Sequence, residues 1–190
     1  NDLGKGVFAM SGGGIGKLLD ASASFGPRIA AGLAAGGVLE GTDSYESFLR
    51  FAQQLLDSGD PINYAVAANA NHPLLLFEVV GDTTAGFLPD QVVPNNAAAN
   101  PPSIVIPGFL SGSTPWQKLM GLTEVSVTPP LAANAGPDSV LRFTRGNHSS
   151  ILDPSGSAAN AATTSIMQCS AVSFLLAGGV SGSTCTPAAP

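Results

Sequence analysis

The stretch Leu74-Leu-Leu-Phe-Glu-Val-Val80 decides the fold class of this chain. It is almost wholly apolar, which is typical of a strand buried on both faces of a parallel sheet; a half-exposed strand alternates apolar and polar residues instead. His72-Pro73 precedes it, and a helix arriving there ends, because proline disfavours helical backbone in the residue before it. Gly81 follows the strand and indicates a loop on that side.

Further strands and helices alternate on both sides of this strand. The predicted strands are 7–10, 124–128 and 139–144, and the predicted helices are 15–20, 25–39, 43–56, 60–68, 115–120 and 157–176. Helices that alternate with buried strands predict an α/β fold. We expect residues 1–190 to form a single domain, with 25–70 as a candidate helical cap or lid within it. Ordinary packing of two helices on the sheet is the alternative for that segment.

Two helix starts carry capping signals. Asp43-Ser-Tyr-Glu46 fits a capping box, in which Asp43 accepts from first-turn amides and Glu46 reaches back. Asp60-Pro61 has the cap and first-turn proline of the next helix. The low-complexity stretch 96–102 is expected to be exposed. Apolar residues at helical spacing predict an amphipathic helix behind the capping box: Tyr45, Phe48, Leu49, Ala52, Leu55 and Leu56.

The charge balance excludes a nucleic acid as the partner. The net charge is -6, and the 7 Lys and Arg residues form no stripe, whereas binding to phosphates needs clustered cations. No apolar run approaches the roughly 20 residues that span a bilayer. The longest largely apolar stretch, 29–39, is interrupted by glycines.

Cys169 and Cys185 are the chain's two cysteines. The favoured interpretation is a disulfide between them, whose loop would stabilise the fold by about 3 kcal/mol. Two unpaired thiols, one of them a small buried apolar group, are the alternative. The low charge, the acidic balance and a flexible tail favour a secreted protein, and that in turn favours the disulfide. Neither cysteine lies near a histidine at zinc-ligand spacing, and no cofactor is expected.

An acid and a histidine each follow a predicted strand. Asp90 comes after the strand at 74–80, and His148 comes after the strand at 139–144. An acid followed by a histidine is the chain order of the Ser…Asp…His triad of α/β-hydrolases. The sites of parallel sheets lie at the carboxyl ends of their strands. There His148 would accept a proton from a nucleophile, and Asp90 would hold its ring.

Other residues compete for these roles. Asp82 follows the strand directly, whereas Asp153 lies too close to His148 in sequence for the usual order. His72, at a helix-to-strand corner, is expected to be structural. The alternatives for the favoured pair are a surface carboxylate at Asp90 and a loop histidine held by local hydrogen bonds at His148.

Ser11 is the candidate nucleophile within the chain. Ala9-Met-Ser-Gly-Gly13 fits the alanine variant of the G-x-S-x-G elbow. An elbow must start a helix, however, and each glycine after Ser11 costs about 1 kcal/mol there relative to alanine. Nothing upstream supplies the strands and the oxyanion loop that precede an elbow. These two objections favour a nucleophile outside this chain, on an N-terminal segment or a partner chain, and leave Ser11 as the alternative.

Four stretches in a fixed order carry a family resemblance. They are Met10-Ser-Gly-Gly-Gly-Ile-Gly-Lys-Leu-Leu-Asp-Ala-Ser-Ala-Ser-Phe-Gly-Pro27, Asp90-Gln-Val-Val-Pro-Asn95, Gly112-Ser-Thr-Pro115 with Leu119-Met-Gly-Leu-Thr123, and Arg142-Phe143 with Gly146-Asn-His148. Together they resemble the C-terminal part of bacterial extracellular lipases of the Pla-1/cef type, over about residues 7–176. The family pattern transfers onto Asp90 and His148 only.

The resemblance implies a serine ester hydrolase, secreted or on the bacterial cell surface, that acts on lipid or acyl esters. This chain would supply the C-terminal half of an α/β-hydrolase sheet with a helical cap. The N-terminal half of the same hydrolase, or a separate partner chain, would complete the sheet and supply the serine. Contact with a lipid interface or membrane would be transient. The alternatives are a non-catalytic secreted binding module derived from a hydrolase and a minimal esterase that uses Ser11.

Overall fold

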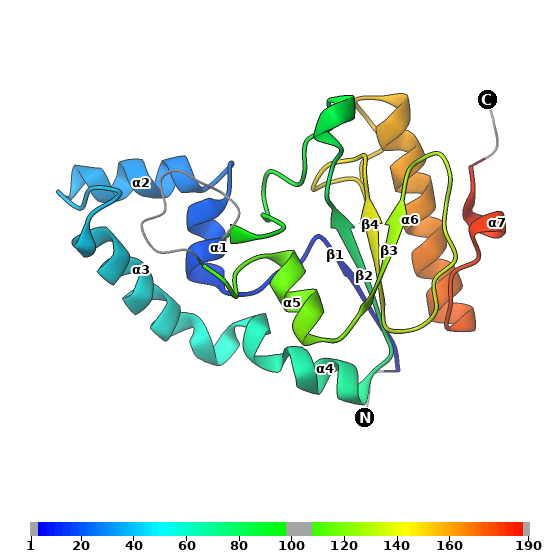
Figure 1. The fold of residues 1–190 in the computed structure, drawn as a ribbon, viewed down its shortest axis with the longest axis horizontal. Helices are drawn as coiled ribbons and strands as arrows, with labels where there is room; N and C mark the ends of the chain where they lie inside the picture. The colour runs from blue at the N-terminus through cyan, green and yellow to red at the C-terminus, as the bar shows by residue number, and fades with distance from the viewer. Residues whose placement is uncertain (1–3, 98–107, 188–190) are drawn as a thin grey trace. The chain divides into compact units, whose positions relative to one another are not determined.

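The computed structural model describes residues 4–97 and 108–187. The chain has an α/β fold with a four-stranded parallel sheet, which confirms the fold class expected from the sequence (Figure 1). Its contacts form two compact units. The first consists of Asn1–Ser11, Val66–Asp90 and Met120–Pro190, and the second of Gly12–Ala65 and Gln91–Leu119.

The sheet belongs to the first unit, and all its strands run parallel. The strands are β1 (Gly6–Ala9), β2 (Leu74–Val79), β3 (Thr123–Val127) and β4 (Ser139–Phe143), each within one residue of its predicted ends. Their order is β1-β2-β4-β3, so the chain passes over one position to β3 at the edge and then returns to place β4 beside β2. The carboxyl ends of β2 and β4 are therefore neighbours.

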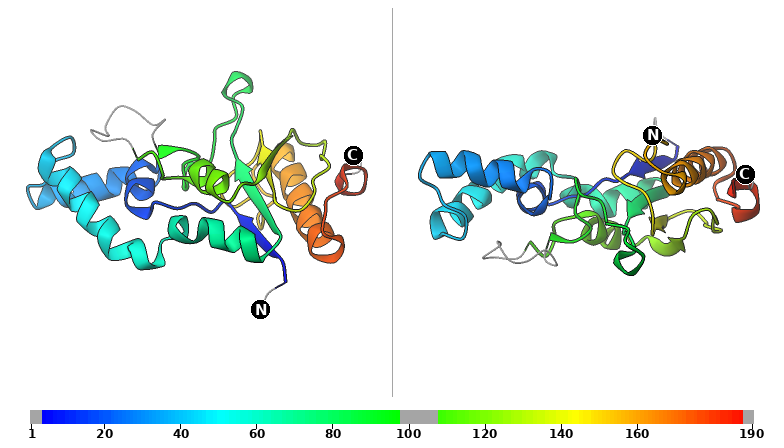
Figure 2. Two further views of the ribbon diagram at one scale, coloured as in Figure 1. Left: turned by 60° about the horizontal axis from the view of Figure 1, so that its bottom comes forward. Right: turned by 90° about the horizontal axis from the view of Figure 1, so that it is seen from above.

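Strand β2 forms the centre of the core. All six of its residues are buried, as its apolar run predicts. Leu75, Phe77 and Val79 join a core cluster with residues of β4 and of helix α6 (Ala158–Ala177), which covers one face of the sheet (Figure 2). Burial on both faces explains why this strand shows no alternation of apolar and polar residues.

Glu78 is the one charged residue of β2, and it lies in the strand's buried run. Arg142 of β4 donates through Nε to Glu78 Oε2 at 2.8 Å and through Nη1 to Glu124 of β3 at 3.0 Å. A buried carboxylate is tolerated when it is paired and hydrogen-bonded. The ion pairs therefore join β2, β4 and β3 across the sheet.

Except for α7, which was not predicted, the remaining helices differ from prediction mostly at their ends. They are α1 (Ile15–Ala21), α2 (Gly26–Ala35), α3 (Asp43–Leu56), α4 (Ala65–Asn71), α5 (Ser113–Leu119) and α7 (Gly182–Cys185). The helix predicted over 60–68 is instead a 3-10 turn, Pro61–Tyr64, followed by α4. Of the stretch 96–102, residues from 98 on lie outside the described residues, and Ala97 is buried rather than exposed. No helix in the described ranges is both long and apolar enough for a bilayer crossing.

The capping box predicted for Asp43 and Glu46 is wrong, as the start of helix α3 shows. Its N-cap is Thr42, whose hydroxyl accepts from Tyr45 N at 3.3 Å, and Asp43 is already the first helical residue. The Glu46 carboxylate does not reach back, because it accepts from Lys17 Nζ of α1 at 2.7 Å. Contact with α1 therefore overrides the local capping pattern.

The apolar face of α3 is only partly buried. Tyr45 and Leu49 are in the core, whereas Phe48, Leu55 and Leu56 are 44%, 83% and 40% exposed. The helical spacing correctly predicted the helix and its apolar residues. It could not predict that much of this face would remain open.

Asp60 joins three segments of the second unit. Its carboxylate accepts from Gly14 N, Ile15 N and Ile62 N at 2.9, 2.8 and 3.0 Å, and from Gln53 Nε2 at 2.7 Å. The residue is completely buried. Burial alone would raise the pKa of Asp60, but these hydrogen bonds outweigh it and hold the pKa below the ordinary 3.8.

We expect Asp60→Asn to lower the free energy of unfolding by about 3 kcal/mol, because an amide keeps one acceptor oxygen and turns a donor toward other donors. The folded-state pKa of Asp60 is depressed, so its contribution is fully present above about pH 4 and is lost as the pH falls through that folded pKa. Urea unfolding between pH 7 and pH 3 measures both effects. Asp57→Asn, at an exposed carboxylate that also accepts from Gln53, is the matched control. Equal stabilities of the two variants would contradict the expectation.

The predicted disulfide is confirmed. Cys169 of α6 and Cys185 of α7 are bonded, with their Cα atoms 5.4 Å apart. The bond ties the short α7 to the last long helix of the first unit.

Replacing both Cys169 and Cys185 by serine is expected to lower the free energy of unfolding by about 3 kcal/mol, since the loop between them spans 16 positions. Guanidinium unfolding with and without reductant measures the change. Reductant should shift the unfolding midpoint of the parent chain and leave that of the double variant unchanged. If neither the double substitution nor the reductant shifts the unfolding midpoint, the expectation is contradicted.

Candidate active site

Asp90 lies at the carboxyl end of β2, although it follows that strand by a long loop. The chain leaves β2 at Val80 and Gly81, whose amides both donate to Phe143 O of β4, and then returns. On its return Asp90 N donates to Val79 O, the last residue of β2, at 3.0 Å. The side chain is only 2% exposed. The backbone thus fixes a buried carboxylate at the edge where α/β sites lie.

Gly81 makes this return possible. Its φ is +70°, and a Cβ there would lie 2.6 Å from both Leu88 C and Pro89 N. Only glycine fits a left-handed backbone with another chain segment so close. The sequence indicated a loop at Gly81, but the close approach depends on the tertiary path.

The competing acids have structural partners of their own. Asp82 is exposed, and its carboxylate accepts from Ala85 N at 3.2 Å to cap the 3-10 turn η3 (Thr83–Ala85). Asp153 is exposed too, and hydrogen bonds from the side chain and backbone of Ser155 hold its pKa below the usual value. Among the described residues, neither carboxylate contacts a histidine, and Asp90 is the acid that the fold places against one.

His148 lies in a tight turn after β4. Asn147 Oδ1 accepts from Ser149 N at 2.8 Å, and Asn147 N donates to Ser150 Oγ at 2.8 Å. Ser150 N also donates to Asn147 O at 3.1 Å. Asn and Ser side chains that bond nearby backbone in this way stabilise turns. The turn therefore fixes the backbone from which the imidazole projects.

The turn is anchored to α6. The buried Ser150 donates through Oγ to Asn160 Oδ1, and Asn160 Nδ2 donates to Asp153 O at 2.8 Å. Gly146, with a φ of +123°, lies so close to Ser150 and Thr163 that a Cβ would be 2.9 Å from each. Ser150 and Asn160 are not recognisable as positioning residues in the sequence, because only the docking of α6 determines which of its polar residues contacts the turn.

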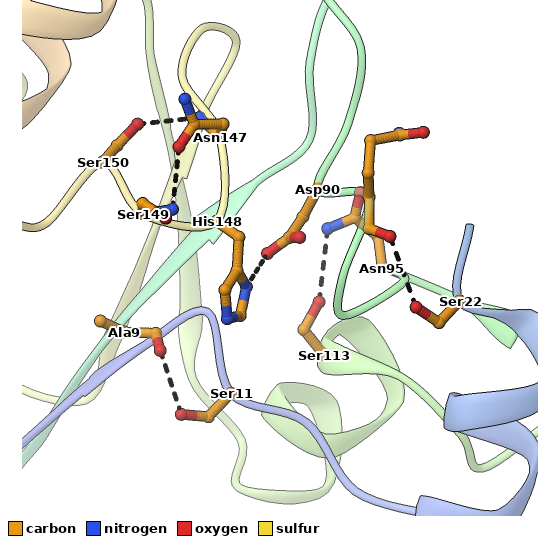
Figure 3. A network of polar contacts seen from close by, with 11 residues as sticks. Ala9, Ser11, Ser22, Asp90, Asn95, Ser113, Asn147, His148, Ser149 and Ser150 are labelled. Atoms are coloured by element: carbon orange, nitrogen blue, oxygen red, sulfur yellow. Dashed lines mark hydrogen bonds and ion pairs between the residues drawn. The ribbon is translucent and has the colours of Figure 1, made fainter. Parts of the chain in front are cut away.

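The fold brings Asp90 and His148 together. Asp90 Oδ2 and His148 Nδ1 are 2.8 Å apart, and the imidazole side chain is 38% exposed while the carboxylate is buried (Figure 3). A carboxylate on Nδ1 favours the tautomer with its proton there, which leaves Nε2 free to accept a proton. Figure 3 shows Nε2 on the side of the ring that faces Ala9 and Ser11.

Ser11 follows β1 and belongs to the same unit as this pair. Its Oγ donates to Ala9 O at 3.3 Å, and among the described residues no hydrogen bond joins it to His148. Met10 has a φ of +46°, so the chain turns sharply where the strand ends. Helix α1 begins only at Ile15, after three glycines, and not directly behind Ser11 as in a nucleophile elbow.

His72 is at the other end of the sheet. It precedes β2 at the amino end of that strand, whereas His148 lies beside the carboxyl end. Within the described ranges, no group of three or more His, Cys, Asp or Glu residues could hold a metal ion.

Comparisons of this chain with protein-family models, with curated proteins and with solved structures found no match. Among the described residues, the contact between Asp90 and His148 is the feature that points most directly to a function.

Proposed function

We propose that this chain supplies the acid and the base of a secreted serine ester hydrolase. The observation that carries the proposal is the 2.8 Å contact between the buried Asp90 carboxylate and His148, at the carboxyl ends of the adjacent parallel strands β2 and β4. An imidazole oriented by a buried acid and open to solvent on its other side is the arrangement of a general base.

In this mechanism His148 Nε2 takes the proton of a serine hydroxyl as the serine oxygen attacks the ester carbonyl. Asp90 keeps Nδ1 protonated and stabilises the imidazolium that forms. The imidazolium then gives its proton to the departing alcohol, which leaves an acyl-serine. In the second half, His148 activates a water molecule in the same way, and the acid is released.

The nucleophile is proposed to lie outside this chain. Strand β1 is at one edge of the sheet, and its residues are only partly buried. A further strand that paired with β1 in parallel would end at the edge occupied by Asp90 and His148. Exposed edges of parallel sheets are normally covered, so the N-terminal half of the same hydrolase or a partner chain is the proposed source of this strand and its serine.

The proposed substrates are lipid or acyl esters, and the proposed relatives are the extracellular lipases of the Pla-1/cef type. This assignment rests on the four quoted sequence stretches and their order. The Cys169–Cys185 disulfide supports secretion, because disulfides persist in oxidising compartments.

The test of this function is the hydrolysis of p-nitrophenyl esters, from acetate to palmitate, by the natural protein with all its segments present. Saturable hydrolysis that stops after treatment with phenylmethanesulfonyl fluoride is the expected result. Absence of hydrolysis for every chain length would contradict the proposal and favour a non-catalytic binding module.

A further inference from the structure

The second unit holds an apolar groove formed by helices α1, α2 and α3. Its volume is about 320 Å³, and its walls are almost entirely carbon. The lining side chains include Leu19 of α1, Ile29 and Leu33 of α2, and Phe48, Ala52 and Leu56 of α3. None of the lining residues belongs to the first unit, so the groove is complete within one compact unit.

The groove exists because α2 and α3 both pack on α1 rather than closely on each other. Figure 1 shows α2 and α3 diverging from the turn that joins them, with α1 between their other ends. Helix α2 is built largely of small residues, Gly-Pro-Arg-Ile-Ala-Ala-Gly-Leu-Ala-Ala, which cannot fill the space. Phe48 and Leu56 consequently remain 44% and 40% exposed on the opposite wall.

One charged residue lines this groove. Arg28, in the first turn of α2, is exposed, and among the described residues its guanidinium has no ion pair or hydrogen bond. The other lining residues are apolar side chains or glycine. An apolar cavity with a single cation matches a ligand that has a long apolar part and one negative charge.

We propose that this groove binds one fatty acid, with its alkyl chain between α2 and α3 and its carboxylate at Arg28. The volume lies at the lower end of the roughly 300–1,000 Å³ typical of small-molecule sites, which suits one chain better than a two-chain lipid. The proposal does not depend on ester hydrolysis, because neither Asp90 nor His148 lines the groove.

A larger side chain in place of Gly32 would block the groove. Gly32 lines the cavity, and a Cβ added to it meets no atom within 4 Å. Leucine at this position would therefore project into the groove without a clash, and it favours helix over glycine. Ala34→Leu places the same side chain on the same helix, at an exposed residue outside the lining.

The experiment is a fluorescence titration of the protein with cis-parinaric acid. Saturable binding with one site per chain is expected, weakened at least about tenfold by Gly32→Leu and unchanged by Ala34→Leu. Circular dichroism of both variants verifies that α2 is intact. Absence of saturable binding by the parent protein, or equal binding by Gly32→Leu, would overturn the proposal.

Arg28→Gln tests the charge. It should weaken binding of cis-parinaric acid by about fivefold, as for one partly exposed charge-assisted hydrogen bond, and leave binding of the methyl ester unchanged. Equal effects on acid and ester would refute the role of the carboxylate. Association with phosphatidylcholine vesicles without binding of the free acid would show a bilayer-docking surface instead, and it too would overturn the proposal. If the natural protein binds the fatty acid but hydrolyses no ester, the hydrolase assignment is contradicted and the fatty-acid site is supported.

Discussion

Replacing His148 by alanine is expected to lower ester turnover by about 10⁴- to 10⁶-fold, the range found when a triad base is removed. Without the imidazole, no group accepts the serine proton or returns it to the leaving alcohol. The measurement is kcat/KM for p-nitrophenyl butyrate with the complete natural protein. The His148 side chain is 38% exposed, and its turn is held by Asn147, Ser149 and Ser150, so the variant should remain folded.

His72→Ala is the matched control for this prediction. It removes the chain's other histidine, at the opposite end of β2, and should leave turnover unchanged. Undiminished turnover in His148→Ala would contradict the assignment. The contact between Asp90 and His148 would then have only a structural role, as many pairs of ionisable groups in proteins do.

Asp90→Asn is expected to lower turnover by about 10³- to 10⁴-fold with little change in shape. The Asn amide can present a donor to His148 Nδ1, which favours the tautomer that carries its proton on Nε2. That nitrogen could no longer accept the serine proton. The loss should therefore appear in kcat more than in KM, since the substrate need not touch Asp90.

Asp82→Asn is the control for this substitution. Asp82 lies on the same loop after β2 as Asp90, but its carboxylate caps η3. The Asp82→Asn variant should retain turnover. Unfolding midpoints of both variants, measured in urea, separate a lost catalytic role from a destabilised fold. Equal activity of Asp90→Asn and the parent protein would show that the carboxylate does not orient the base.

Much of the fold was predictable because its signals are local. The apolar run of β2 marks a strand buried on both faces, and the alternation of helices and strands predicts a parallel sheet. The pairing of Asp90 with His148 was also within reach, since residues that follow parallel strands lie at one edge of the sheet. Their contact further requires β4 to be adjacent to β2, which the chain order alone does not specify.

The features that sequence missed depend on tertiary contacts. Thr42 replaces Asp43 as the cap of α3 while Glu46 turns to Lys17 of α1, and no local pattern encodes that choice. The anchoring of Ser150 by Asn160 likewise requires α6 to dock beside the turn. A periodic apolar face similarly predicts a helix but not how completely neighbouring helices cover it.

We propose that His148 serves a serine located outside this chain. This role of His148 is tested most directly by intact-mass analysis of the natural protein after reaction with a fluorophosphonate probe, in the parent and in His148→Ala. We expect an adduct on a serine of another segment or a co-purifying chain, and loss of that adduct in the variant. An adduct on Ser11, or no adduct on any chain, would contradict it.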